Sequence, residues 1–260
     1  MLILISPAKT LDFETDLLTR KFSTPDFVNE SAELVGSLVR KSPAELEELM
    51  HLSPALADLN AARYHDWEPD FHFENSRQAL LAFKGDVYVG MDIDRFSQRD
   101  FTRSQKTLRI LSGLYGVLRP LDLIQPYRLE MGTKLATRRG DTLYEFWGDR
   151  ISKSLSADLA SHRSRVIINL ASQEYFSAVN EDVLDARVVS PRFLDEKNGK
   201  FKIISFYAKQ ARGVMASWLI LNRIESVAGL TRFREAGYSY CQERSMPDEP
   251  VFIRPEKASS

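Results

Sequence analysis

The motif SPAK at residues 6–9 combines residue types that could act on a phosphate or a reactive carbonyl. It matches the S-x-x-K pattern, in which a lysine one helical turn after a serine activates the hydroxyl as a nucleophile. The companion motifs S-D-N and K-T-G do not occur in the sequence. A serine followed by proline is equally typical of a helix N-cap and its first turn. We therefore interpret 6–9 as a strand-to-helix junction with Lys9 facing an anion. A purely structural turn and a nucleophilic Ser6 remain as alternatives.

A second polar group follows an apolar segment in INLASQEYF at residues 168–176. Asn169, Ser172 and Glu174 come directly after the predicted strand, which is where open α/β sheets tend to hold ligands. Ser172 can instead simply cap the next helix. With Ser6, these three residues form a candidate small-ligand site.

The segment LSGLYGVLRPLDL at residues 111–123 resembles a helix-hairpin-helix element. In such elements a glycine turn exposes backbone amides to a phosphate, and neighbouring arginines hold adjacent phosphates without reading base sequence. Gly113 and Gly116 supply the glycines, and Arg109 and Arg119 bracket the turn. The two glycines are separated by two residues, whereas the usual element separates them by one. The alternative is a helix-ending glycine and a tight apolar turn with incidental arginines.

Basic residues recur in the second half of the chain. Lys200 lies beside a predicted hairpin turn, and Lys209 and Arg212 lie one turn apart on a predicted helix. The stretch from 197 to 223 contains six basic residues and no acidic one. Such a set can follow a phosphate backbone, or it can be an ordinary solvated surface.

The sequence contains no recognisable metal site or nucleotide-binding loop. His51, His65, His72 and His162 form none of the H-x-H, H-x-x-x-H or H-E-x-x-H patterns. Neither G-x-x-x-x-G-K-[ST] nor G-x-G-x-x-G occurs. Cys241 is the only cysteine and is interpreted as a plain thiol. We assign no metal ligand, cofactor or catalytic residue, and we favour a non-enzymatic role while leaving enzymatic activity open.

The composition is that of a globular protein whose charges are unevenly distributed. Hydrophobic residues make up 43% and charged residues 27% of the 260 residues, and the net charge is −1. The net charge alone argues against a nucleic-acid partner. However, residues 101–140 contain eight basic residues against two acidic ones, a local balance of +6, which predicts a basic face. No apolar run is long enough to span a membrane, and no signal peptide is recognisable, so we expect a cytoplasmic protein.

The predicted strands and helices that position these residues indicate a mixed α/β (α+β) fold. We expect a single domain over residues 1–255 and a frayed tail at 256–260. Apolar runs predict strands at 2–5, 165–170 and 186–190, and short alternation predicts another at 86–89. Arms at 192–196 and 201–207 flank Asn198-Gly199, which predicts a β-hairpin. Helical spacing predicts helices over 30–41, 42–50, 53–65, 74–83, 99–113, 142–162 and 208–224.

Several blocks of the sequence resemble the YaaA family of bacterial peroxide stress proteins. The resemblance rests on SPAKT at 6–10 and the run SGLYGVLRPLDLIQPYRLEMG at 112–132. It continues through LNAARYHDW, LAFKGDVY, LYEFWGD, INLASQEYF and FLDEKNGKFKIISFYAKQARG. It implies a mixed α/β fold with a helix-hairpin-helix and a positively charged cleft. It also implies cytoplasmic proteins that limit unincorporated iron during peroxide stress and bind duplex DNA.

The resemblance extends the cleft role to specific positions of this chain. The residues expected to contact DNA phosphates are basic, apart from two glycines in the turn: Lys9, Arg63, Lys84, Arg109, Gly113, Gly116, Arg119, Arg128, Lys200, Lys209 and Arg212. The leading hypothesis is therefore an oxidative-stress protein that binds double-stranded DNA through a basic cleft. The alternative is an enzyme acting on a nucleotide or nucleoside, with a composite site around Ser6, Lys9, Asn169 and Glu174.

Overall fold

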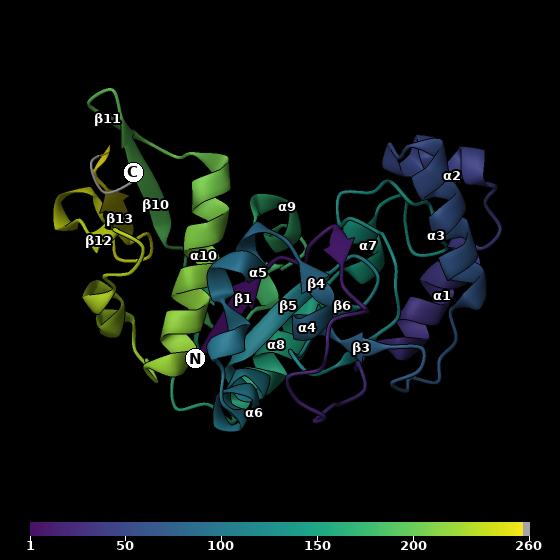
Figure 1. Ribbon diagram of the computed structural model, residues 1–260, viewed down its shortest axis with the longest axis horizontal. Coiled ribbons are helices and arrows are strands. Elements are labelled where there is room, and N and C mark those ends of the chain that lie inside the picture. The colour runs from purple at the N-terminus through teal and green to yellow at the C-terminus, as the bar shows by residue number, and fades with distance from the viewer. Residues whose placement is uncertain (257–260) are drawn as a thin grey trace.

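The computed structural model describes residues 1–256 and is built around a central five-stranded sheet (Figure 1). Within those residues the strand order is β6-β5-β1-β8-β9. The strands are β1 (Leu2–Ile5), β5 (Leu108–Ser112), β6 (Gly116–Leu118), β8 (Val166–Asn169) and β9 (Arg187–Val189). β5, β1, β8 and β9 run parallel, and β6 pairs antiparallel with β5. The mixed sheet and surrounding helices confirm the predicted fold class.

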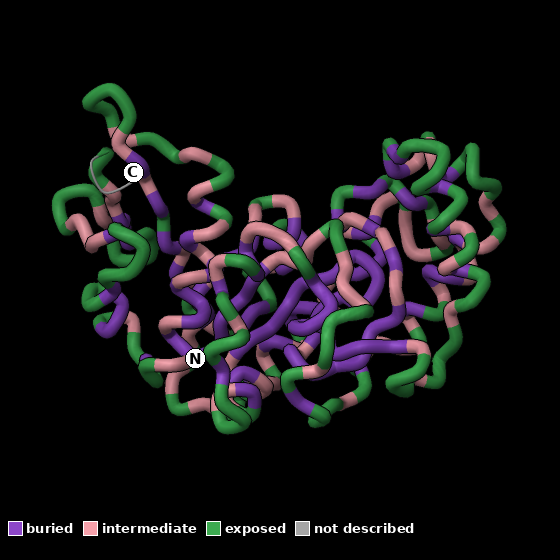
Figure 2. The backbone as a smooth tube through the Cα atoms, viewed as in Figure 1, coloured by how far each residue is buried: buried purple, intermediate pink, exposed green. Residues whose placement is uncertain are grey.

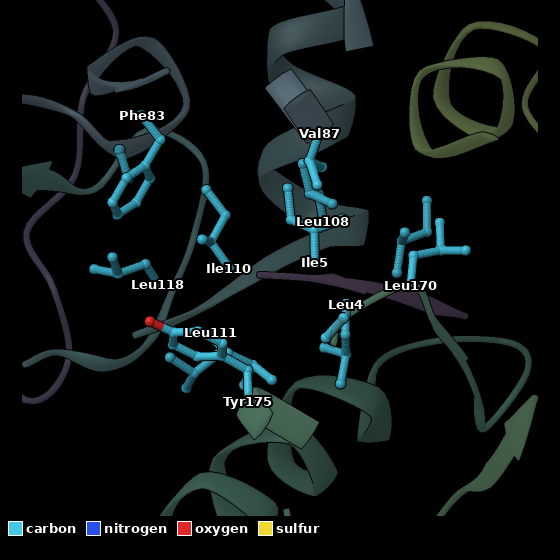
Figure 3. Packing of buried hydrophobic residues seen from close by; sticks show 14 of the residues in the cluster. Leu4, Ile5, Phe83, Val87, Leu108, Ile110, Leu111, Leu118, Leu170 and Tyr175 are labelled. Atoms are coloured by element: carbon cyan, nitrogen blue, oxygen red, sulfur yellow. The ribbon is translucent and has the colours of Figure 1, made fainter. Parts of the chain in front are cut away.

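The strand β1 lies in the middle of this sheet, as its continuous apolar sequence predicts. Ile3 pairs with Leu108 of β5 on one side and with Ile168 of β8 on the other. Every side chain of β1 is buried, so both faces of the strand contact the core. Figure 3 shows Val87 and Tyr175 on opposite sides of β1, because helices cover the sheet from both faces.

The covering helices come from distant parts of the chain. They are α5 (Asp86–Met91), α6 (Gln98–Thr107), α8 (Arg150–Ala160), α9 (Gln173–Phe176) and α10 (Ser205–Leu221). α5 and α10 approach each other closely through two glycines. A Cβ atom on Gly213 would lie 1.8 Å from the carbonyl oxygen of Val87, and one on Gly90 would lie 2.2 Å from that of Gln210. Only glycine permits this spacing.

A second sheet and a helical region project at the two ends of the molecule (Figure 1). The second sheet has the order β11-β10-β13-β12, from β10 (Arg192–Lys197), β11 (Lys200–Lys202), β12 (Ser239–Tyr240) and β13 (Val251–Arg254). Asn198 and Gly199 have φ values of 54° and 71°, which confirms the predicted hairpin turn. The predicted second arm over 201–207 was too long, because β11 ends at Lys202 and residues 205–207 begin α10. The helical region holds α1 (Val28–Leu38), α2 (Pro43–Met50) and α3 (Pro54–Asp66). Figure 2 shows that exposed residues are frequent on both projections and that buried residues concentrate at the centre. The outline of the molecule is concave between the two projections.

Some predicted elements were wrong. Residues 86–89 form part of α5, not a strand. The predicted helix over 99–113 ends at Thr107, because residues 108–112 pair with β1 as β5; tertiary pairing here overrides helical spacing. The predicted helix over 142–162 is divided by Gly148, whose φ is 47°, into α7 (Leu143–Trp147) and α8.

Short elements complete the fold. Two strand pairs join β2 (Thr10–Leu11) to β4 (Phe83–Lys84) and β3 (Arg77–Gln78) to β7 (Leu123–Ile124). The helix predicted over 74–83 is reduced to α4 (Ala79–Ala82). Short 3-10 helices span Ile93–Arg95, Glu181–Val183, Val227–Arg232 and Gln242–Arg244.

The predicted frayed tail lies mostly beyond the part that the structure describes. Residues 257–260 are outside the described residues, and the backbone amide of Glu256 donates a hydrogen bond to Glu196. Across residues 1–256, no helix has both the length and the apolar composition required to cross a membrane.

Candidate functional site

The carboxyl ends of β1 and β8 form the natural ligand-binding edge of the central sheet. From β1 the chain continues to β5 on one side of β1, and later to β8 on the other side. The strand order therefore reverses between β1 and β8, and open α/β sheets bind ligands outside the carboxyl ends of strands at such a reversal. The serine predicted at the end of each strand lies at this point.

Ser6 and Ser172 are joined directly across the reversal. The Ser6 hydroxyl accepts a hydrogen bond from the Ser172 amide at 2.8 Å and lies 3.3 Å from the Ser172 hydroxyl oxygen. The hydroxyl of Tyr88 donates to the Ser6 carbonyl oxygen at 3.1 Å. The structure thus brings together two of the four residues predicted for a small-ligand site.

The predicted strand-to-helix junction at SPAK was wrong. No helix follows Ser6: residues 7 and 8 belong to no helix or strand, and Lys9 lies in a bend just before the short strand β2. Two residues of β2 pair with β4, which places this segment in a strand pair and not in a helix. Lys9 therefore faces no helix N-terminus, and the S-x-x-K spacing does not place Lys9 one helical turn from Ser6.

Lys9 belongs to a charged network beside the reversal. Its ammonium lies 2.7 Å from a carboxylate oxygen of Glu130, and the Arg128 guanidinium lies 3.2 Å from the other oxygen. Glu174 accepts a hydrogen bond from the Gly132 amide at 3.0 Å. These side chains line a cavity of about 880 Å³ closed on its far side by α2. Its lining carries four basic and four acidic side chains, so this cavity is electrically balanced.

Asn169 shapes the backbone instead of lining that cavity. Its side-chain oxygen accepts from the Ala171 amide at 3.0 Å, and its amide nitrogen donates to the Ser190 hydroxyl at 3.2 Å. The first bond fixes the turn that follows β8, and the second ties the end of β8 to the segment after β9. Asn169 is thus three residues from Ser172 in the chain, but both polar atoms of its side chain already form hydrogen bonds within the protein.

Arg212 is the predicted site residue with the most unusual surroundings. It lies on α10, on the helix face that it shares with the buried Ala216 and Ile220. Burial lowers the pKa of its guanidinium below the ordinary arginine value. Among residues 1–256 no side chain or carbonyl forms a hydrogen bond or ion pair with the Arg212 guanidinium. A half-buried cation without a partner suits an anion from outside the chain.

Two further predicted cations are partly engaged. Lys84, on β4 opposite Thr10, lies 3.3 Å from the Asp12 carboxylate. The Thr15 and Glu14 amides and the Thr15 hydroxyl hold the pKa of Asp12 well below its usual range. Arg63 on α3 makes one long hydrogen bond of 3.4 Å to Asn60, and burial lowers its pKa. Arg63 is not brought next to Lys9 in the described cavity.

The most open basic surface is the lysine arm, which we define as the β10–β11 hairpin with the start of α10. It carries four exposed lysines: Lys197, Lys200, Lys202 and Lys209. Within the described chain their ammonium groups have no ion-pair or hydrogen-bond partner. Phe206 and Ile203 lie on the same arm with 51% and 53% of their surface exposed. Figure 1 shows this arm projecting from one end of the molecule.

The helix-hairpin-helix prediction for residues 111–123 was wrong, because these residues form the buried β5–β6 hairpin and the turn after it. Gly113 and Gly116 are buried in this hairpin. The Trp147 indole donates to the Gly113 carbonyl at 3.0 Å, and a Cβ atom on Gly116 would lie 2.7 Å from the Trp147 ring. Neither glycine presents a free amide to a phosphate. Their role is to allow close packing in the core.

The two arginines that bracket this hairpin are structural. Arg109 is 5% exposed; its Nε lies 2.6 Å from Asp158. Arg119 donates from its backbone amide and its Nε to Asp122, which is 1% exposed, at 2.7 and 3.0 Å. Its Nη2 also contacts Asp26 at 2.9 Å. Both arginines lie at the amino edge of the sheet, away from Lys9 and the lysine arm.

Comparison with known proteins identifies the family to which the chain belongs. A family model described as peroxide stress protein YaaA matches residues 1–244. The chain belongs to this family. The family predicted from SPAKT and the 112–132 run is confirmed, and with it a general role of this YaaA-family protein in the oxidative stress response.

Sequence reasoning missed Glu130 and Gly132 of this YaaA-family chain as parts of the site. Both lie inside the 112–132 run that carries the family resemblance, but neither has a residue type that singles it out. The Glu130 carboxylate pairs with both Lys9 and Arg128, and the Gly132 amide donates a hydrogen bond to Glu174. The signal that could have found Glu130 is its position as one of only two acidic residues in the basic stretch 101–140. Among the described residues, no group of three or more His, Cys, Asp or Glu side chains is arranged to hold a metal ion.

Proposed function

We propose that this YaaA-family protein binds duplex DNA, chiefly through phosphate contacts made by the lysine arm. The observation that carries the proposal is the set of four exposed ammonium groups that have no partner in the described chain. A paired lysine must give up its carboxylate before it meets a phosphate, whereas these lysines need not. Phosphates then supply regularly spaced negative charges along one line, which an extended hairpin can follow.

Side chains near the lysines support a nucleic-acid partner. Phe206 and Ile203 place exposed apolar surface between cations of the arm. Apolar side chains beside basic ones suit contact with sugars and with the faces or steps of bases. Arg212, further along α10, offers a partly buried cation for one more phosphate. The proposed surface thus combines charge with apolar contact and does not depend on base-specific hydrogen bonds.

This binding also offers a physical route to the iron-linked part of peroxide protection. Lysines that neutralise phosphates release the cations condensed around the duplex. Ferrous ions are among the cations that collect there, and they react with peroxide where they are bound. Displacing them would move the damaging reaction away from the DNA, so the proposed protection needs no metal site on the protein.

The test is fluorescence anisotropy on a labelled duplex at several salt concentrations. The dissociation constant should rise steeply with salt, with a log–log slope of about 0.9 for each neutralised phosphate. The double variant Lys200→Glu/Lys202→Glu should bind more weakly, and its slope should be smaller by the contribution of about two phosphates. The same variant should protect plasmid DNA from nicking by ferrous iron and peroxide less well than the unaltered protein.

Lys106→Glu is the matched control, because Lys106 is an exposed lysine at the opposite edge of the sheet. Combined with Arg163→Glu, at a second exposed cation of that edge, it carries the same change of charge as the double variant and should leave DNA binding unchanged. Salt-insensitive binding would contradict the proposal. So would a Lys200→Glu/Lys202→Glu variant that binds as tightly as the control.

The reversal between β1 and β8 favours a second candidate function, an enzyme acting on a nucleotide or nucleoside. The hydrogen bonds between Ser6 and Ser172, with Lys9 and Glu174 nearby, place polar groups at the sheet edge that commonly holds such ligands. The cavity of about 880 Å³ beside them is large enough for a nucleoside monophosphate.

A thermal-shift screen with nucleosides and nucleoside monophosphates tests this second function. A ligand at about 100 times its dissociation constant should add about 2.7 kcal/mol to the free energy of unfolding. Lys9→Met should abolish the shift, and Lys202→Met, on the lysine arm, should preserve it. A screen in which no ligand raises the melting temperature would remove this candidate.

A further inference from the structure

A second hollow lies on the opposite edge of the sheet from the predicted site. This amino-edge hollow has a volume of about 1180 Å³. It is bounded by the starts of β1 and β5 and by the carboxyl-terminal ends of α6, α8 and α10. Neither the family role nor the proposed DNA surface uses it.

The walls of the amino-edge hollow are strongly basic. The basic side chains outnumber the acidic ones seven to two, and they are Arg103, Lys106, Arg109, Arg119, Arg163, Arg223 and Arg232. Three of them are neutralised within the chain: Arg103 by Glu225, Arg109 by Asp158, and Arg119 by Asp26 and Asp122. The other four, Lys106, Arg163, Arg223 and Arg232, are exposed. No side chain of the described chain pairs with any of these four.

These cations exceed what the neighbouring helix ends require. Basic side chains stabilise the carboxyl-terminal ends of helices, where each helix carries roughly half a negative charge. Three helices end here, at Thr107, Ala160 and Leu221, which amounts to about 1.5 negative charges. Four unpaired cations outweigh that figure. The hollow therefore keeps a net attraction for anions.

The floor of the hollow offers a ligand almost no apolar surface. Ile3, Leu219 and Ile224 line it, but only 2%, 1% and 6% of their surface is exposed. A ligand would therefore make its contacts with the cations of the walls.

We infer that the amino-edge hollow binds a polyphosphate chain, free or carried by a nucleotide, with its phosphates among the unpaired arginines and Lys106. At about 1180 Å³ the hollow is somewhat larger than the roughly 300 to 1000 Å³ of common small-molecule sites, so it has room for an extended anion. The two carboxylates that line the hollow, those of Asp158 and Glu225, are each paired with an arginine. Binding therefore draws its positive charge from the protein and does not require a divalent cation.

The experiment is isothermal titration calorimetry of the full chain with ATP and, separately, with inorganic tripolyphosphate, both in EDTA. Both should bind, and tripolyphosphate should bind at least as tightly as ATP because the phosphates make the contacts with the cations. Arg163→Gln and Arg232→Gln should each weaken ATP binding about tenfold, the effect of losing a charge-assisted hydrogen bond. Both residues are exposed and unpaired, so the variants should unfold at the same temperature as the unaltered protein.

Lys202→Gln is the control, because it removes one positive charge from the lysine arm and should leave ATP binding unchanged. Four outcomes would overturn the inference: no ATP binding, tripolyphosphate binding more than tenfold weaker than ATP binding, an absolute need for magnesium, or displacement of ATP by duplex DNA. The last outcome also separates this inference from the proposed DNA binding. ATP affinity that falls in Arg163→Gln while duplex affinity does not would support two independent sites.

Discussion

Arg109 holds three parts of the protein together from one buried guanidinium. Its Nε contacts Asp158 of α8, and its Nη1 donates to the Gln105 and Leu108 carbonyls at 3.0 and 2.7 Å. The end of α6, the start of β5 and α8 are thereby fixed to each other. An arginine that satisfies three acceptors inside the chain is not available to a phosphate.

We predict that Arg109→Leu lowers the free energy of unfolding by about 2 to 4 kcal/mol. The change leaves the Asp158 carboxylate and two backbone carbonyls without their hydrogen-bond donor. Because Asp158 is partly exposed, the cost stays below that of breaking a fully buried ion pair. Urea denaturation followed by circular dichroism measures it. Asp158→Asn retains the shape and should cost less. A variant as stable as the unaltered protein, or one whose main defect is in DNA affinity, would contradict this structural role.

Individual residues could be predicted from sequence where their surroundings are local. Lys200 follows a hairpin turn and Lys209 lies on the polar side of a helix, so the exposure of both follows from neighbouring residues. The partner of Arg109 is 49 residues away in the chain, and no local pattern identifies it. Arg119 differs, because Asp122 is only three residues away, but the burial of that carboxylate depends on the whole fold.

The contact between α5 and α10 sets the position of the helix that carries Lys209 and Arg212. Its closeness depends on Gly90 and Gly213, each facing a backbone carbonyl of the other helix. Hydrogen bonds cannot replace this fit, since the helices touch through backbone atoms. The helix pair therefore depends on the absence of two side chains.

We predict that Gly213→Ala destabilises the protein by about 3 kcal/mol. The added methyl group would lie 1.8 Å from the Val87 carbonyl oxygen, so α10 must shift away from α5. Gly36→Ala is the matched control: Gly36 lies within α1, where a Cβ atom meets nothing within 4 Å. That change should stabilise by about 0.5 to 1 kcal/mol through helix propensity. If the melting temperatures of Gly213→Ala and Gly36→Ala changed in the same direction, the close contact between α5 and α10 would not explain the effect.

Elements were predictable where the signal was contained within them. The Asn198-Gly199 turn fixes its own hairpin, and the Ser42 and Glu45 capping box at 3.3 and 2.8 Å fixes the start of α2. The strand β5 was missed because residues 99–111 have helical spacing throughout. Only pairing with β1, more than a hundred residues earlier, makes 108–112 a strand. The helix α5 was missed because its six residues are too few for a period to be recognised.

At the scale of the whole molecule, the two edges of the central sheet have different charge. The carboxyl edge joins Ser6 to Ser172 beside a cavity with equal numbers of acidic and basic side chains. The amino edge holds the hollow with seven basic side chains and two acidic ones. The basic stretch 101–140, which predicted one basic face, contributes residues to both edges of the sheet. The single predicted surface therefore corresponds to two separate hollows. Sequence clustering found the excess of charge but could not divide it between them.

The central position of β1 also determines when this protein can fold during its synthesis. β1 leaves the ribosome before both of its neighbours, and its second partner is complete only when Asn169 has been added. At about 5 to 20 residues per second, one edge of the apolar strand Leu2–Ile5 stays unpaired for roughly 10 to 30 s, although β5 can pair with the other edge earlier. The nascent chain therefore exposes an apolar strand edge until Asn169 has been added, which makes it a natural client for chaperones at the ribosome exit.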